Sequence, residues 1–156
     1  MTTVEPIVKS ITVRVPQERA FEVFTAGMDR WWNREYSIGA QPLETVVLEP
    51  REGGRWFERD AAGGECDWGR VLAWEPPGRV VLTWQVSAGW TYDPALATEL
   101  EIRFTPVDDG ATEVRLEHRG LEQYGDAAAA MRAALDDPTG WAGLLERLAE
   151  ATVPAA

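Results

Sequence analysis

Few side chains in this sequence could carry out covalent chemistry. Its 156 residues include one histidine, His118, and one cysteine, Cys66. A histidine can act as a general acid or base near neutral pH, or orient a ligand carbonyl. His118 is therefore the candidate catalytic residue, and a structural histidine bonded to a backbone carbonyl is the alternative. Cys66 alternates with Trp68 in a predicted strand, and we interpret it as a small apolar filler rather than a nucleophile.

Two neighbouring charged residues, Glu58 and Arg59, lie in the middle of a predicted strand. Successive side chains of a strand point to opposite faces, so one of the two must point inward. A buried charge needs a partner. The sequence leaves two interpretations open: an ion pair within the sheet, or a polar anchor for a ligand head group, with Arg59 as the candidate to receive an anion.

Sequence signatures of cofactor and metal sites are absent. The sequence has no G-x-S-x-G nucleophile elbow, phosphate-binding loop or dinucleotide fingerprint. One histidine and one cysteine also exclude His-rich and thiolate-cluster metal sites. We predict no cofactor, no metal and no dedicated catalytic machinery.

Tryptophan is the residue type that stands out, with eight in the chain, roughly four times a typical share. Large aromatic rings fill hydrophobic cores, and they also shape pockets for apolar ligands. Both interpretations stay open for each tryptophan at this point.

The net charge of -11 restricts the partners. An acidic surface repels phosphate backbones and anionic lipid leaflets, so we expect neither nucleic acid nor membrane as a partner. There is no signal-like N-terminus and no apolar run of membrane-spanning length. The sequence predicts a soluble cytoplasmic protein with a single domain over residues 1–156.

The elements that must position these residues follow from hydrophobic periodicity. Residues 7–15 alternate as a half-buried strand, Pro16 opens a short helix that ends near Gly27, and a second helical turn carries Trp31 and Trp32. Turn residues separate the strands that follow, and Asp109-Gly110 predicts a two-residue hairpin. The predicted strands of this antiparallel meander are 45–48, 55–60, 65–74, 79–86, 98–104 and 112–118.

The last third of the chain changes to helical periodicity. Residues 126–135 are alanine-rich and helical, and a final helix is expected from about Thr139 to Ala151. Its apolar stripe is Trp141, Leu144, Leu145 and Leu148. Strand alternation places this stripe opposite the inward-facing strand residues. The residues expected to line a cavity there are Trp31, Trp32, Trp56, Glu58, Trp68, Trp74, Leu82, Trp84, Phe104, Leu116, His118, Trp141 and Leu145.

Several motifs resemble the START-like SRPBCC superfamily, and within it bacterial proteins similar to the C-terminal domain of the activator of heat-shock protein 90 ATPase. They are GGRWFER from Gly53, WGRV from Trp68, WEPPGRVVLTWQ from Trp74, LEHRG from Leu116, and Gly140-Trp141 at the final helix. The resemblance implies an α+β helix-grip (START-like) fold: two short helices after the first strand, and a curved antiparallel sheet wrapped around a long C-terminal helix. It also implies a cavity between sheet and helix, which the superfamily uses for lipids, sterols, polyketides and other apolar molecules.

The leading functional expectation is binding of a small apolar or aromatic molecule in that cavity. One alternative is an enzyme of cyclase or hydrolase type on aromatic or polyketide substrates, with His118 as acid or base. Another is an interaction module that activates a chaperone ATPase, a partner for which the resemblance is the sole basis. A homodimer is also compatible with the sequence. One fold hosts all of these activities, so only the residues of the site can distinguish among them.

Overall fold

A curved antiparallel sheet frames the molecule. The computed structural model describes residues 4–33, 36–39 and 41–152, and within these residues seven strands pair in the order β1-β7-β6-β5-β4-β3-β2. Every neighbouring pair is antiparallel. The strands are β1 (Ile7–Val13), β2 (Leu43–Leu48), β3 (Arg55–Asp60), β4 (Glu65–Glu75), β5 (Arg79–Trp84), β6 (Thr98–Asp108) and β7 (Ala111–Arg119).

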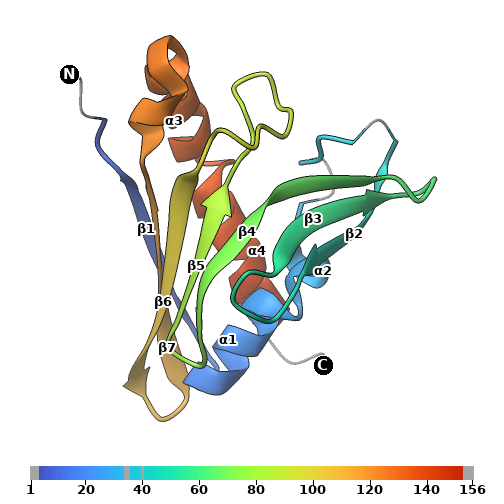
Figure 1. Ribbon diagram of the computed structural model, residues 1–156. Helices are drawn as coiled ribbons and strands as arrows, with labels where there is room; N and C mark the ends of the chain where they lie inside the picture. The colour runs from blue at the N-terminus through green and yellow to red at the C-terminus, as the bar shows by residue number, and fades with distance from the viewer. Residues whose placement is uncertain (1–3, 34–35, 40, 153–156) are drawn as a thin grey trace.

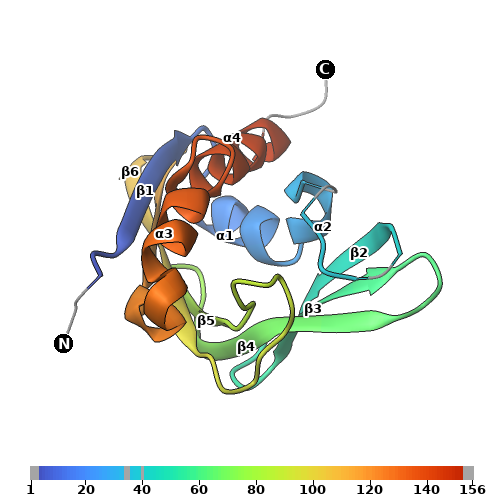
Figure 2. The ribbon, with the colours of Figure 1, turned by 90° about the horizontal axis from the view of Figure 1, so that it is seen from above.

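Five helical segments accompany the sheet in the described residues, and the longest is at the C-terminal end (Figure 1). Seen from above, the sheet curves around one side of the molecule, and α1, α2 and α4 lie on its concave side (Figure 2). The predicted helix-grip fold, with two short helices after the first strand, is therefore confirmed. The segments are α1 (Gln17–Thr25), α2 (Met28–Trp31), the 3-10 helix η1 (Leu121–Ala127), α3 (Ala128–Asp136) and α4 (Trp141–Thr152).

The predicted element boundaries need small corrections. The strand expected over 79–86 stops at Trp84, and Val86 forms only an isolated bridge with Tyr92. The α-helix expected over 126–135 begins only at Ala128, and it is preceded by a 3-10 segment in which Gly125, with a φ of 60°, makes a kink. The hairpin turn at Asp109-Gly110 is confirmed, since Asp108 pairs with Ala111.

Strand β4 bends near its middle, and this bend gives the sheet its curvature. Its first half pairs with β3 and its second half with β5. Gly69 lies at the changeover, and a Cβ there would approach the Thr83 carbonyl oxygen to 1.8 Å. Only glycine permits this close approach of two backbones. The bend carries β2 and β3 around toward α2 (Figure 1).

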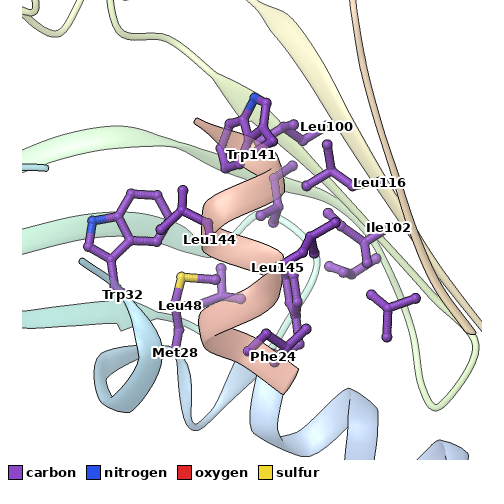
Figure 3. Packing of buried hydrophobic residues seen from close by; sticks show 14 of the residues in the cluster. Phe24, Met28, Trp32, Leu48, Leu100, Ile102, Leu116, Trp141, Leu144 and Leu145 are labelled. Atoms are coloured by element: carbon purple, nitrogen blue, oxygen red, sulfur yellow. The ribbon is translucent and has the colours of Figure 1, made fainter. Parts of the chain in front are cut away.

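Helix α4 packs its predicted apolar stripe against the concave face. Trp141, Leu144, Leu145 and Leu148 are all buried. Figure 3 shows Trp141, Leu144 and Leu145 among residues of β6, β7, α1 and α2, with Leu144 between α4 and Trp32. The core therefore lies between this helix and the sheet, as the two periodicities predict.

The convex face of the sheet carries ion pairs. The Glu101 carboxylate accepts hydrogen bonds from Arg79 and Arg119, and it pairs with Arg103. Burial raises the pKa of Glu101, but the hydrogen bonds from the two arginines outweigh it and lower the pKa to about 2. This face is polar, which leaves the concave face for a site.

Candidate ligand-binding cavity

A cavity of about 320 Å³ lies between the first turns of α4 and the bent part of the sheet. Exposed residues such as Trp90 and Thr139 contribute to its wall, so it reaches the surface. The residues that line it come from the segment after α2, from β4, β5 and the β5–β6 loop, and from α3 to α4. They are Trp32, Tyr36, Ser37, Ile38, Trp68, Trp84, Trp90, Ala134, Leu135, Thr139, Gly140, Trp141 and Leu144.

Four buried indoles form the inner wall of this cavity. Trp32 follows α2, Trp68 lies in β4, Trp84 ends β5, and Trp141 begins α4. Their ring centroids are 4.7 Å apart for Trp32 and Trp68, and 5.5 Å apart for Trp84 and Trp141. Edge-to-face and tilted contacts of this kind are favourable for aromatic rings. Four chain segments thus meet in one aromatic surface.

Hydrogen bonds fix three of these indoles in place. The Trp32 N–H donates to the Tyr36 carbonyl oxygen at 2.9 Å, and the Trp68 N–H donates to the Glu58 carboxylate at 2.9 Å. The Trp141 N–H donates to Nδ1 of His118 at 3.1 Å. The buried N–H of Trp84 has no hydrogen-bond partner among the described residues. A wall held this way is ordered before a ligand arrives, which lowers the entropy cost of binding.

His118 is fully buried behind Trp141, in agreement with the strand phase. Burial lowers its pKa to about 3, so the imidazole is neutral at pH 7. Because Nδ1 accepts from Trp141, the proton is on Nε2, which donates to the Thr98 hydroxyl oxygen at 2.9 Å. Thr98 in turn donates to the Trp84 carbonyl oxygen at 2.6 Å.

Both ring nitrogens of His118 are therefore occupied by side chains, rather than by the backbone carbonyl of the structural alternative. No lone pair remains for a ligand proton, and His118 is not among the residues that line the cavity. It can influence the cavity through the orientation of Trp141.

Glu58 is the inward member of the charged pair, with 1% of its surface exposed. Its carboxylate accepts hydrogen bonds from the Ser37 hydroxyl at 2.7 Å and the Ile38 N–H at 2.6 Å, in addition to Trp68. It therefore ties the cavity-lining segment after α2 to the sheet. Arg59 points outward and pairs with Glu65 at 3.0 Å, so the expectation that it receives a ligand head group is wrong.

Two features mark the mouth of the cavity. The Tyr36 hydroxyl donates to the Thr139 carbonyl oxygen at 2.5 Å and joins the segment after α2 to the turn before α4. Trp90, in the β5–β6 loop, is 47% exposed and has a φ of 61°. A left-handed backbone is costly for a bulky residue, and strain of this kind is concentrated at functional sites.

The structure divides the thirteen predicted site residues into groups. Four tryptophans line the cavity, and Glu58 and His118 lie behind two of them. Phe104 packs in the core against Phe21, the half-buried Trp74 also contacts Phe21, and neither residue lines the cavity. The remaining five border a gap of about 10 Å³ in the core: Trp31, Trp56, Leu82, Leu116 and Leu145.

Sequence reasoning missed the residues of the mouth. Trp90 is an aromatic residue in a stretch of turn residues, and that mismatch was an available signal. Tyr36 and Ser37 lie in a segment without periodicity, where no pattern indicates which side chains turn inward. Among the described residues, no cluster of three His, Cys, Asp or Glu side chains could hold a metal ion. No helix in the described part of the chain is long and apolar enough for a membrane span.

The curved sheet, the gripping C-terminal helix and the apolar cavity between them define a helix-grip protein of the START-like class. Within that class, the chain belongs to the family of activator of Hsp90 ATPase homolog 1-like proteins, whose pattern matches residues 14–152. No curated protein sequence gives a significant match.

Several solved structures are similar over almost the whole chain. An anthrahydroquino-gamma-pyrone synthase, Txn09, complexed with SUM, is 35% identical over 98% of this chain and 100% of that chain, with a TM-score of 0.67. The self-sacrificing resistance protein CalC from Micromonospora echinospora is 26% identical over 95% of this chain and 94% of its own, with a TM-score of 0.69.

The Aha1 dimer from Colwellia psychrerythraea is 19% identical, covers 96% of both chains and has a TM-score of 0.64, so it supports the fold alone. Dimerisation and a chaperone partner stay predictions for this chain.

Proposed function

We propose that this protein binds a small, largely apolar aromatic molecule in the cavity between the sheet and the start of α4. The observation that carries the proposal is the wall of four buried indoles around about 320 Å³ of open space. A well-packed core leaves no void of this size, because such a void forfeits dispersion contacts. A bound aromatic molecule would restore those contacts.

The size and polarity of the cavity restrict its occupant. Its volume is at the lower end of the range for small-molecule sites, which suits a compound of two or three fused rings. None of the described lining residues is a lysine or arginine, and the chain has a net charge of -11. Neutral ligands are therefore favoured over fatty-acid and other carboxylate anions. Micromolar affinity corresponds to about 8 kcal/mol, which burial of such a ligand can supply.

A fluorescence titration tests the proposal directly, because five tryptophans line the site. The panel contains sterols, flavonoids, fatty acids and polycyclic aromatic compounds, with Trp84→Phe to assign the signal. Saturable quenching or a spectral shift with at least one neutral aromatic compound is the expected result.

A matched pair of variants locates the binding. Ala134 and Ala133 are both exposed on α3, but only Ala134 lines the cavity. Ala134→Phe should block binding, whereas Ala133→Phe should leave it unchanged. Binding that Ala134→Phe leaves intact, or no saturable change with any compound, would contradict the proposal.

A second candidate function is catalysis on the bound molecule. The observation in its favour is the 35% identity to a synthase across both chains. His118 offers little as a base, because both of its nitrogens are occupied. Incubation of each bound compound with the protein, followed by mass spectrometry, distinguishes a catalyst from a carrier. A new product that depends on the open cavity, and is absent with Ala134→Phe, would establish turnover.

A further inference from the structure

Three hydroxyl groups lie in the residues that line the cavity, and each has already donated its proton within the protein. Ser37 donates to Glu58 at 2.7 Å, and Tyr36 donates to the Thr139 carbonyl oxygen at 2.5 Å. The Thr139 hydroxyl donates to the Asp137 carboxylate at 2.7 Å. These three oxygens therefore have no proton left to donate to a ligand and can only accept, although the Ser37 oxygen already accepts one bond from the Gly39 N–H at 3.3 Å.

The direction of these bonds follows from the chemistry of the acceptors. A backbone carbonyl oxygen can only accept a hydrogen bond, and so can an ionised carboxylate. Hydrogen bonds from the Thr139 backbone N–H and hydroxyl lower the pKa of Asp137, so its carboxylate stays ionised at neutral pH. Both oxygens of Glu58 already face donors: Trp68 and Ile38 on one, Ser37 and Gly39 on the other. None of the three hydroxyls can reverse without the loss of a strong bond.

Three of the five lining indoles supply no donor to a ligand. The N–H groups of Trp32, Trp68 and Trp141 are occupied. The Trp84 N–H is buried without a partner, and the exposed Trp90 at the mouth makes no indole hydrogen bond among the described residues. The three hydroxyls therefore act as hydrogen-bond acceptors, and side-chain donors in the described part of the wall are restricted to these two indoles.

We propose that the cavity selects a neutral aromatic molecule with free hydroxyl groups, a phenol or hydroquinone, which donates its protons to the oxygens of Ser37, Tyr36 and Thr139. This inference rests on the proposed function and names the ligand class of the same site. An ether or a quinone of the same shape brings acceptors against acceptors and leaves buried groups unpaired. A carboxylate adds repulsion from Glu58 and Asp137.

Three naphthalenes of related shape provide the test: 2,6-dihydroxynaphthalene, 2,6-dimethoxynaphthalene and naphthalene-2,6-dicarboxylate, with unsubstituted naphthalene as the apolar reference. Calorimetric titration at pH 7 should give the diol at least about tenfold tighter binding than the dimethyl ether, because one unpaired buried group costs about that factor. The dicarboxylate should bind more weakly than naphthalene itself.

Variants of the acceptor residues give an independent readout. Thr139→Val and Tyr36→Phe should each reduce the ratio of diol affinity to naphthalene affinity about fivefold or more, because only the diol uses the hydroxyl oxygen. Thr105→Val, at an exposed position of β6 outside the cavity, is the matched control and should change neither. Unchanged naphthalene affinity shows that the cavity itself is intact in a variant.

The outcomes separate the two proposals. If naphthalene and the ether bind in the cavity as tightly as the diol, or the dicarboxylate binds best, the inference about hydroxyl groups is wrong and the ligand-binding function stands. If none of the four compounds binds, and the wider panel also gives no saturable change, the proposed function itself fails.

Discussion

The two ends of the interface between α4 and the sheet differ in how they fill space. Farther along α4, Leu145 and Leu148 are buried, and the gap that borders Leu145 is only about 10 Å³, although Trp31 and Trp56 border it together with aliphatic side chains. At the N-terminal end, Trp141 faces three other indoles around about 320 Å³ of open space. One helix and one sheet therefore produce a tight core and a cavity within a few turns.

Polar partners contribute to this difference. At the tightly packed end the indoles of Trp31 and Trp56 also make hydrogen bonds, but leucine side chains beside them change rotamer until they interdigitate. The indoles at the other end are fixed by hydrogen bonds to His118, Glu58 and a backbone carbonyl. If they moved inward to fill the space, these buried groups would lose their partners, at a cost of about 1–3 kcal/mol each. A cavity can thus be maintained by buried polar groups that never touch its contents.

Trp141→Ala should have the largest effect on stability and on ligand binding. The substitution removes a buried ring that contacts Trp32 and Trp84, and it leaves Nδ1 of His118 unpaired. We expect a loss of about 3–5 kcal/mol in the free energy of unfolding by urea, together with loss of ligand binding. A loss under about 1 kcal/mol would mean that the ring borders solvent and that the wall is not fixed.

Leu148→Ala probes the tightly packed end, where the side chain is fully buried. The expected destabilisation is about 2–5 kcal/mol from lost burial and the new void. Ligand affinity of the folded variant should match the unsubstituted protein, because Leu148 does not line the cavity. A large loss of affinity in calorimetry would show that packing at the C-terminal end of α4 affects the cavity at its N-terminal end.

The pH dependence of stability tests the buried histidine. The folded pKa of His118 is lowered to about 3, so below about pH 6.5 the unfolded chain binds a proton that the folded chain does not. Stability is therefore fully present above pH 6.5 and falls as the pH decreases. Between pH 6.5 and 5, urea unfolding should show a loss of about 2 kcal/mol. The corresponding loss from Glu101, whose pKa is about 2, begins only below about pH 4.5.

His118→Gln supplies the control for this slope, since glutamine does not titrate. Its stability should change much less over the same interval of pH. An imidazole that titrates near pH 6.5 in a folded sample, by NMR, would place His118 in contact with water and contradict its buried position.

The smallest effect on stability should come from Trp90→Gly at the mouth. Glycine adopts a φ near 61° without strain, and the ring is 47% exposed, so we expect a change of less than about 1 kcal/mol in either direction. The affinity for an aromatic ligand should nevertheless fall several-fold, because one ring of the mouth is lost. An unchanged affinity would show that Trp90 lies beside the site without contacting the ligand.

Hydrophobic periodicity predicted the helices and strands whose apolar residues recur at a regular spacing. The stripe from Trp141 to Leu148 and the alternation around Leu116 were enough to place helix and sheet face to face. Trp56 and Trp68 show where this reasoning stops, because both are 1% exposed and lie on paired strands, yet only Trp68 lines the cavity. Alternation gives the face of a side chain, but not whether the space in front of it is filled.

Contacts between distant segments were also beyond the sequence. The strand pattern predicted that Glu58 or Arg59 points inward, but three of the four donors to Glu58 come from residues about 20 positions earlier, in a segment without periodicity. The strained Trp90 is likewise positioned by its loop rather than by any repeat. Such residues become visible only when the folded chain brings the segments together.

Locating a bound aromatic ligand by NMR tests most directly whether the cavity between α4 and the sheet is a ligand site. Intermolecular NOEs between 2,6-dihydroxynaphthalene and the indole protons of the protein report which rings contact it. We expect NOEs to Trp32, Trp68 and Trp141 together, and their loss in Ala134→Phe. Saturable binding with NOEs only to residues outside the cavity, such as the exposed Leu72 on β4, would show that the hydrogen-bonded indoles do not form the ligand site.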